Sequence, residues 1–236
     1  MALSGKEEAA IIKEISEKFE AVSQIKKHLL DGEGKHEAYR KLEALVNKFG
    51  ARFSGTQALE DAITHVSDLM KLEGIDVTLE KAQVKHWVRG EENAQLVSPI
   101  KVDIKISGLG SSVATPNDSP LEADIVVVRN FEELKNLGTA NVSDKIVVYN
   151  QEWVKEHKYP IDSYGDTVAY RNRGASEAAK LGAVGALIRS VTPFSLGTVH
   201  TGWQDYEEGV PKIPAACTTK EDSQTCLLYT SDAADE

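Results

Sequence analysis

Residues 125–128 (Ile-Val-Val-Val) and 145–149 (Lys-Ile-Val-Val-Tyr) are two short runs made almost entirely of β-branched and aromatic residues. Continuous apolar runs of this length predict strands covered on both faces, because a strand with one face in solvent would alternate apolar and polar residues. A third run, 184–188 (Val-Gly-Ala-Leu-Ile), follows later, and we expect a last strand at 213–218. The second half of the chain is therefore predicted to contain a buried sheet.

The segments between these runs predict helices that cover the sheet. Residues 131–137 fit one short helix, and the small residues of 173–181 (Arg-Gly-Ala-Ser-Glu-Ala-Ala-Lys-Leu) fit a helix that packs closely on a sheet. A long polar loop, 190–212, leads to the last strand. The second half thus mixes helices and strands in one compact unit, so the expected fold class is α/β, or more broadly α+β.

The first half of the chain has a helical period. Apolar residues at helical spacing predict three helices, over residues 6–30, about 39–49 and about 57–73. Gly50 and Gly74 follow the second and third helices and are expected to end them.

The pattern changes after the third helix. Val77 and Leu79 alternate with polar residues, and the alternation is strict over residues 100–106, which predicts half-exposed, antiparallel strands. The glycines and prolines of residues 107–120 then mark a candidate domain boundary.

The composition excludes several classes of protein. The 236 residues carry 37 Asp and Glu against 27 Lys and Arg, a net charge of −10, which argues against a nucleic-acid-binding protein. The two cysteines form no Cys-x-x-Cys pair, so a cysteine zinc site is excluded, and no apolar run approaches the length of a membrane span. Composition alone selects no function.

The segment 107–112 (Ser-Gly-Leu-Gly-Ser-Ser) is the weakest functional candidate. A glycine-rich phosphate loop needs a helix directly after it, so that the helix amides point at the phosphate. Residues 113–120 contain two prolines and no helical pattern. We therefore interpret 107–112 as a tight turn, and a nucleotide-binding domain remains only a minor alternative.

The loop 200–208 gathers one imidazole, three carboxylates and two aromatic rings. Zinc sites usually place such ligands on rigid elements at regular spacing, and no His-Glu-x-x-His helix is present. Two interpretations stay open: a solvated acidic loop, or a loop that lines a substrate cleft with His200, Trp203 and Tyr206.

Two further residues are candidates for chemistry. Asn141 begins the glycosylation sequon Asn-Val-Ser, so we consider it a possible glycan site. Cys217 lies in an apolar strand, where a thiol is expected to pack rather than to act as a nucleophile.

The last eleven residues, Cys226–Glu236, break the pattern. Thr219 is a predicted N-cap with acidic residues in the following turn, but the apolar stripe expected of that helix does not continue. The string 226–236 resembles a translated sequencing adaptor, so we expect it to be a non-native tail that is excluded from fold reasoning. The alternative is an ordinary frayed C-terminus.

A resemblance to a known family becomes specific from Tyr39 onward. The matching motifs, in order, are Tyr39-Arg-Lys-Leu42, Arg52-Phe-Ser-Gly55, His86-Trp-Val-Arg-Gly-Glu-Glu92, Gly108-Leu-Gly-Ser-Ser112, Lys145-Ile-Val-Val-Tyr-Asn-Gln151, Val168-Ala-Tyr-Arg171, Ala178-Ala-Lys-Leu-Gly-Ala183, Leu187-Ile-Arg-Ser-Val191, His200-Thr-Gly202 and Gly209-Val-Pro-Lys-Ile-Pro214. Over roughly residues 36–224 the chain resembles the carboxypeptidase Q family of zinc metallopeptidases.

This resemblance implies a domain organisation. Residues 1–35 would be a helical, propeptide-like region, and residues 36–110 would be the N-terminal helices and strands that open a zinc-peptidase domain. Residues 111–225 would be an inserted protease-associated (PA) domain beside the catalytic cleft, followed by the non-native tail 226–236.

The resemblance also implies the chemistry of the family. Its members hydrolyse peptide bonds of small peptides with two zinc ions held by His, Asp and Glu side chains, and with a Glu as the general base. Those residues belong to sequence downstream of the PA insert, and none matches a position in this chain. We therefore expect no catalytic residue and no metal ligand here, and neither bound zinc nor activity in this fragment.

Partners and location follow from the same resemblance. It implies a small peptide substrate, a homodimer, and a secreted or lysosomal glycoprotein. The N-terminus shows no basic segment followed by an apolar stretch, so no signal peptide is visible and we expect truncation at both ends.

An alternative from another class is a free-standing PA module that binds peptides or proteins without catalysis. The sequence after Gln224 separates the two: a His-x-Asp segment with further ligands favours the enzyme, whereas a stop codon favours the module.

Overall fold

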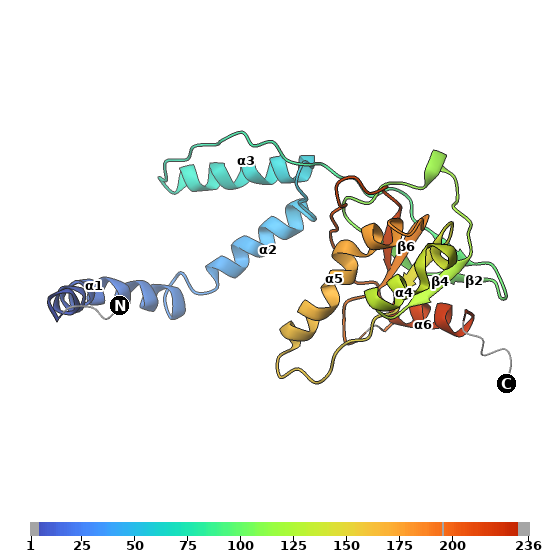
Figure 1. The fold of residues 1–236 in the computed structure, drawn as a ribbon. Helices are drawn as coiled ribbons and strands as arrows, with labels where there is room; N and C mark the ends of the chain where they lie inside the picture. Colours follow the sequence, from blue (N-terminus) through green and yellow to red (C-terminus); the bar gives the residue numbers. More distant parts are fainter. Residues whose placement is uncertain (1–4, 195, 231–236) are drawn as a thin grey trace. The chain divides into compact units, whose positions relative to one another are not determined.

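The computed structural model describes residues 5–194 and 196–230. They belong to two compact units, Met1–His86 and Trp87–Glu236. Figure 1 follows the chain through both units.

The second unit is built on a five-stranded sheet with the order β3-β7-β6-β5-β4. The strands are β3 (Ile106–Gly108), β4 (Ile125–Val128), β5 (Ile146–Tyr149), β6 (Gly185–Arg189) and β7 (Ala215–Thr218). Strands β4, β5, β6 and β7 pair in parallel, and only β3 is antiparallel to its neighbour β7. The predicted α/β class and the four predicted strands of this half are confirmed.

Helices and a hairpin cover the two faces of this sheet. The helices α4 (Phe131–Val142) and α5 (Pro160–Ala179) contribute Leu134 and Ala175 to the core on one face. On the other face, α6 (Lys220–Leu228) packs with the antiparallel hairpin of β1 (Ala94–Leu96) and β2 (Val102–Ile104). A single 3₁₀ turn, η1 (Pro116–Asp118), lies in the connection before β4.

Burial of neighbouring residues on β5 shows why the β-branched runs are continuous. Val147 and Val148 point to opposite faces of the sheet, and the exposed fraction of each side chain is 0%. Both faces therefore need apolar residues, as expected for a parallel sheet covered on both sides.

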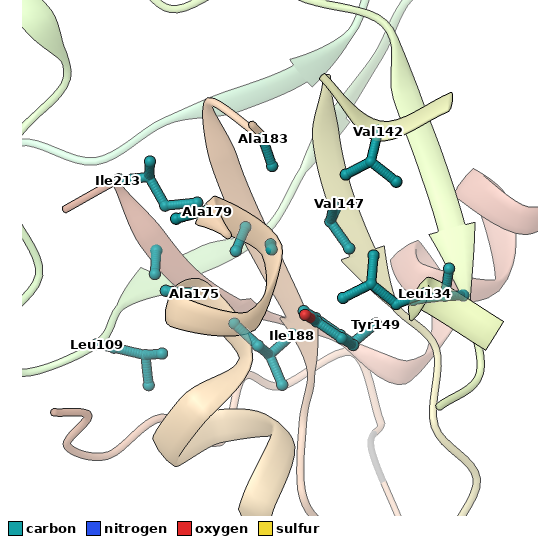
Figure 2. Packing of buried hydrophobic residues seen from close by; sticks show 14 of the residues in the cluster. Leu109, Leu134, Val142, Val147, Tyr149, Ala175, Ala179, Ala183, Ile188 and Ile213 are labelled. Carbon is teal, nitrogen blue, oxygen red and sulfur yellow. The ribbon is translucent and has the colours of Figure 1, made fainter. Parts of the chain in front are cut away.

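The small residues of α5 allow it to approach the sheet closely. Tyr149 on β5 is fully buried, and its hydroxyl donates a hydrogen bond of 2.7 Å to the carbonyl oxygen of Gly174. A Cβ at Gly174 would lie 3.0 Å from Cε2 of Tyr149, so a larger residue would require the Tyr149 ring to shift. Figure 2 shows Ala175 and Ala179 in the same cluster as Tyr149 and Ile188.

Both covering helices are longer than predicted. The helix α4 continues past 137 because Gly138 adopts a φ of 67°, which lets the chain kink and resume the helix to Val142. The helix α5 starts at Pro160 rather than at 173. Its first half contains Gly165 and several short polar residues that are typical of turns, so the sequence pattern there was misleading.

The alternating segment 100–106 is divided between two sheets. Val102–Ile104 pairs with β1, whereas Ile106–Gly108 joins the main sheet beside β7. The antiparallel pairing is confirmed, but the strand predicted at Val77 and Leu79 is wrong, because the structure assigns no strand to residues 75–93. The second unit begins at Trp87, and the PA domain expected at residues 111–225 stays a prediction.

The first unit is helical. It contains α1 (Gly5–Leu30), α2 (Glu37–Phe49) and α3 (Gln57–Leu72), which confirms the three predicted helices. Their apolar faces are largely open, however: α1 and α2 bury no residue, and α3 buries only Ala62 and Ser67.

The helix α6 extends past residue 226, where the non-native tail was predicted to begin. Thr219 caps α6 by accepting a hydrogen bond of 2.9 Å from the Asp222 amide, as predicted. Cys226, the first residue of the expected non-native tail, lies within α6 and is 3% exposed. Residues 231–236 of that tail lie outside the described residues.

No helix in residues 5–194 and 196–230 has the length and apolar character required to cross a bilayer.

We expect Gly174→Val to lower the free energy of unfolding by about 2–3 kcal/mol, because the new side chain overpacks against Tyr149. Gly165→Val in the same helix is the control: its Cβ meets nothing within 4 Å, so the change should stay within about 0.5 kcal/mol. Urea unfolding followed by tryptophan fluorescence measures both, since all three tryptophans lie in the second unit. Equal effects of the two variants would contradict the packing described here.

Candidate functional site

The structure assigns His200 a role in fixing its own loop. Its backbone amide donates to Oγ of Ser190 at 2.8 Å, and its Nδ1 lies 2.8 Å from the carbonyl oxygen of Val191. The imidazole ring is also 6.4 Å, centroid to centroid, from the ring of Tyr164 on α5. These contacts hold the loop against the end of β6.

Trp203 and Tyr206 are anchored differently. The ring of Trp203 lies against Gly110, where an added Cβ would come within 2.5 Å of Cε3, and its Nε1 donates to Asp205 at 3.2 Å. The Tyr206 hydroxyl donates to the carbonyl oxygen of Ile213 at 2.6 Å and accepts from the Val113 amide at 3.1 Å. Trp203 remains 43% exposed, whereas Tyr206 packs on the core.

A buried arginine on α5 contacts the loop of residues 200–208. Arg171 on α5 is 9% exposed and donates from Nη2 to the Tyr164 hydroxyl at 2.6 Å. Its guanidinium lies against Gly202, where a Cβ would be 2.8 Å from Cζ. A larger residue at position 202 would require the guanidinium of Arg171 to shift.

The glycine-rich segment 107–112 has no free amides to offer a phosphate at its glycines. The Gly108 amide donates to Oε1 of Glu92 at 2.8 Å, and the Gly110 amide donates to the carbonyl oxygen of Gly202 at 2.7 Å. No helix follows before η1. Ser107 and Gly108 belong to β3, and a turn follows in which the Ser112 amide donates to the carbonyl oxygen of Leu109 at 2.9 Å. The predicted turn is therefore confirmed only for the end of the segment, and the nucleotide-binding alternative loses its basis.

The structure assembles a polar cluster that the sequence analysis missed. Asn150, at the end of β5, accepts hydrogen bonds at Oδ1 from Nη1 of Arg189 (3.0 Å) and from Oγ of Ser223 (2.9 Å). All three side chains are buried, with exposed fractions of 3%, 6% and 0%. Burial lowers the pKa of the Arg189 guanidinium, and the carboxylates of Glu152 and Glu221 oppose that shift.

Neighbouring groups extend this cluster along the same edge of the sheet. Gln151 donates from Nε2 to the carbonyl oxygen of Arg189 at 2.8 Å, and Ser190 donates to the carbonyl oxygen of Thr218 at 2.7 Å. Ligands of parallel sheets usually bind at this carboxyl edge. A signal for it was present in the sequence, because polar residues directly follow each β-branched run.

The space beside this cluster does not accept a ligand. The crevice lined by Gln151, Trp153, Thr167 and residues 189–192 has no room for a water molecule. Within the described residues Oε1 of Gln151 has no hydrogen-bond partner. The hydrogen bonds of the cluster join α6 and β6 to β5, so its role in this structure is to stabilise the fold.

A second hollow, of about 400 Å³, lies over the first turns of α4. Five of its six lining residues are charged or polar, namely Arg129, Asn130, Glu132, Glu133 and Asn136, and the sixth is Leu137. Ligand pockets are instead predominantly apolar with a few polar groups. His200, Trp203 and Tyr206 line neither this hollow nor the crevice.

The described part of the chain contains no group of metal ligands, and its two cysteines are buried. Across residues 5–194 and 196–230, no three His, Cys, Asp or Glu side chains are placed to hold a metal ion, so this part of the chain does not fit a zinc site. Burial raises the pKa of the Cys217 thiol to about 12 and that of Cys226 to about 11, so both thiols stay protonated. Asn141 is exposed at the end of α4 and donates to the carbonyl oxygen of Leu137 at 2.8 Å.

Comparison with known proteins gives clear relatives. The chain is 44% identical to carboxypeptidase Q of Xenopus laevis over 194 residues, and 40% identical to carboxypeptidase Q of Homo sapiens over 216 residues. These matches cover 82% and 89% of this chain but 39% and 44% of the relatives, so the chain spans less than half their length. No protein-family profile matches the chain.

Solved structures agree with these relatives. The fold superposes on a peptidase M28 precursor from Shewanella amazonensis with a TM-score of 0.77 and 30% identity, over 89% of this chain and 46% of that one. A zinc aminopeptidase from Bacillus subtilis gives a TM-score of 0.54 at 18% identity, over 81% of this chain and 40% of that one, which is a likeness of fold alone.

We expect Asn150→Ala to lower the free energy of unfolding by about 3 kcal/mol, because it leaves Arg189 and Ser223 buried without their shared acceptor. Asn136→Ala, at an exposed position of α4, should change it by less than about 0.5 kcal/mol. Urea unfolding followed by tryptophan fluorescence compares them. A loss at position 150 no larger than that of the control would show that the cluster is not structural.

The two thiols should react slowly with a disulfide reagent at pH 8. Because burial raises both pKa values above the ordinary 9.0, we expect native thiols to react roughly 100-fold or more slowly than thiols of the urea-unfolded chain. Because the pKa of each thiol is higher in the folded chain than in the unfolded chain, protonated thiols add to the free energy of unfolding. This contribution is complete below pH 9 and is lost as the pH rises towards 11–12. Rapid labelling of Cys217 in the native chain would contradict its burial.

Proposed function

Because the chain is homologous to carboxypeptidase Q over most of its length, we propose that it is part of a zinc-dependent metallopeptidase that hydrolyses small peptides. The observation that carries this proposal is 40–44% identity sustained over 82–89% of the chain. The fold supports it, since a peptidase M28 precursor superposes on nearly the same share of the chain.

In this proposal, the catalytic chemistry belongs to sequence that the chain does not contain. In such an enzyme zinc supplies a Lewis acid and an activated water. The described residues do not fit a zinc site, so we assign no catalytic step to them. Their contribution is the scaffold: the two-sided sheet of the second unit and the helices of the first.

The finer features remain part of the proposal. Residues 111–225 would form a PA domain, with His200, Trp203 and Tyr206 facing the substrate cleft of the whole enzyme. That enzyme would hold two zinc ions, form a homodimer, and be secreted or lysosomal, with a glycan at Asn141. The exposure of Trp203 and Asn141 agrees with these roles.

A purified 236-residue chain tests the first consequence. We expect it to retain no stoichiometric zinc after dialysis, measured by plasma mass spectrometry, and to hydrolyse dipeptides no faster than buffer. Full-length human carboxypeptidase Q, treated in parallel, is the positive control. Tight zinc together with dipeptide hydrolysis in the chain alone would overturn its assignment as an inactive part.

A chimera tests the metallopeptidase assignment itself. The chain, without residues 226–236, would replace its matching segment in the Xenopus laevis relative, and dipeptide hydrolysis would be assayed with and without a chelator. We expect zinc-dependent hydrolysis, because the matched segment keeps the scaffold of the relative. A folded chimera that binds zinc but hydrolyses nothing would favour the alternative, a PA module that only binds peptides.

A further inference from the structure

The strand β4 forms one edge of the main sheet, and only one of its two sides is paired. The carbonyl oxygens of Asp124 and Val128 accept hydrogen bonds from amides on β5 and just after it, at 2.9 and 2.8 Å. Successive residues of a strand direct their backbone groups to alternate sides, so residues 124, 126 and 128 face β5. The N–H and C=O groups of Ile125 and Val127 therefore point away from the sheet.

No part of the described chain pairs with this outer side. The strand β4 is last in the order β3-β7-β6-β5-β4, and no hydrogen bond within residues 5–194 and 196–230 reaches the outward groups of Ile125 or Val127. The segment before β4 lies elsewhere, since a Cβ added at Gly185, at the start of β6, would be 3.4 Å from Cδ2 of Leu121. The edge is thus unpaired along β4.

The strand β4 also lacks the features that usually protect an edge. Proteins commonly block an open edge with lysine, proline, a β-bulge or a covering loop, because its free backbone groups pair with any extended chain. Residues 125–128 are all β-branched and apolar, and they pair with β5 in a regular register without a bulge. An unprotected edge of this kind is typical of a site where a peptide adds as a further strand.

Acidic side chains flank this edge at both ends. Residues 122–133 contain four carboxylates against one guanidinium, that of Arg129. Glu122 and Asp124 are exposed just before β4. Beyond its other end, Glu132 and Glu133 line the hollow of about 400 Å³ over the first turns of α4. The charge around the edge therefore favours a cationic peptide over an acidic one.

We propose that the outer side of β4 binds an extended basic peptide as an additional strand. The peptide backbone would pair with Ile125 and Val127, and its Lys or Arg side chains would lie near Glu132, on the face of the sheet that α4 covers. Those basic residues would occupy alternate positions, because every second side chain of a strand points to the same face. The proposal depends neither on zinc nor on hydrolysis, so it holds or fails separately from the proposed function.

A fluorescein-labelled heptapeptide that alternates lysine and valine, capped at both ends, tests this proposal. Its binding to the purified 236-residue chain would be measured by fluorescence anisotropy, and we expect saturable one-to-one binding. The same peptide with methylated backbone nitrogens lacks the donors for strand pairing, so it should bind roughly tenfold or more weakly. A peptide with glutamate in place of lysine should also bind roughly tenfold or more weakly, because the edge is acidic.

Val127→Pro tests the edge itself. Proline removes the outward N–H of residue 127 and leaves the hydrogen bonds to β5 in place, since proline is tolerated where the N–H of an edge strand faces solvent. Val127→Ala shortens the same side chain but keeps the amide, so we expect the proline variant to bind roughly tenfold more weakly than the alanine variant. Circular dichroism and urea unfolding would verify that both variants fold. Equal affinities of the two folded variants would overturn the proposal.

Charge variants test the choice of a basic peptide. Asp124→Asn combined with Glu132→Gln should weaken binding roughly fivefold, whereas Glu208→Gln, at an exposed position of the loop 200–208, should leave it unchanged.

Three outcomes would contradict the proposal independently of the variants. One is that the lysine–valine peptide does not bind, and another is that its methylated form binds equally well, which would leave charge attraction alone. The third is a dimer of the chain that Val127→Pro converts to a monomer, because the edge would then pair with a second copy. The methylated peptide keeps the test decisive even if Val127→Pro fails to fold.

Discussion

The parallel pairing of β5 with β6 is the constraint on which the second unit depends. Both strands are central in the sheet, so both of their faces must be covered. That requirement explains the continuous β-branched run of β5 and the small residues of α5, which let the helix approach until Gly174 touches Tyr149. It also explains why a helix and a hairpin are needed on the opposite face.

The same pairing creates the buried polar cluster. Parallel strands end at one edge, so Asn150 and Arg189, which directly follow or end neighbouring strands, meet there. Ser223 reaches them because α6 begins beside that edge. A charged side chain is tolerated there since Asn150 accepts its hydrogen bond, and the cluster then links three elements. Its tight packing explains why this edge is not a ligand pocket.

The two units differ in how far their own residues complete them. The second unit surrounds its sheet with its own helices, whereas the helices of the first keep most of their apolar side chains in solvent. The chain spans less than half of its relatives, and the role that we propose for its described part is that of a scaffold. Its sequence resembles carboxypeptidase Q and its fold resembles a peptidase M28 precursor, while the proposed chemistry is assigned to residues beyond it.

The sequence by itself determined the local structure: the three N-terminal helices, the strands of the main sheet and the cap at Thr219, because helical period, β-branched runs and capping residues act within a few neighbours. It also contained the family resemblance. Only the tertiary structure decided that residues 100–108 divide between two sheets, that α5 extends back to Pro160, and that Asn150, Arg189 and Ser223 meet. These features depend on contacts between residues far apart in the chain, which no local pattern records.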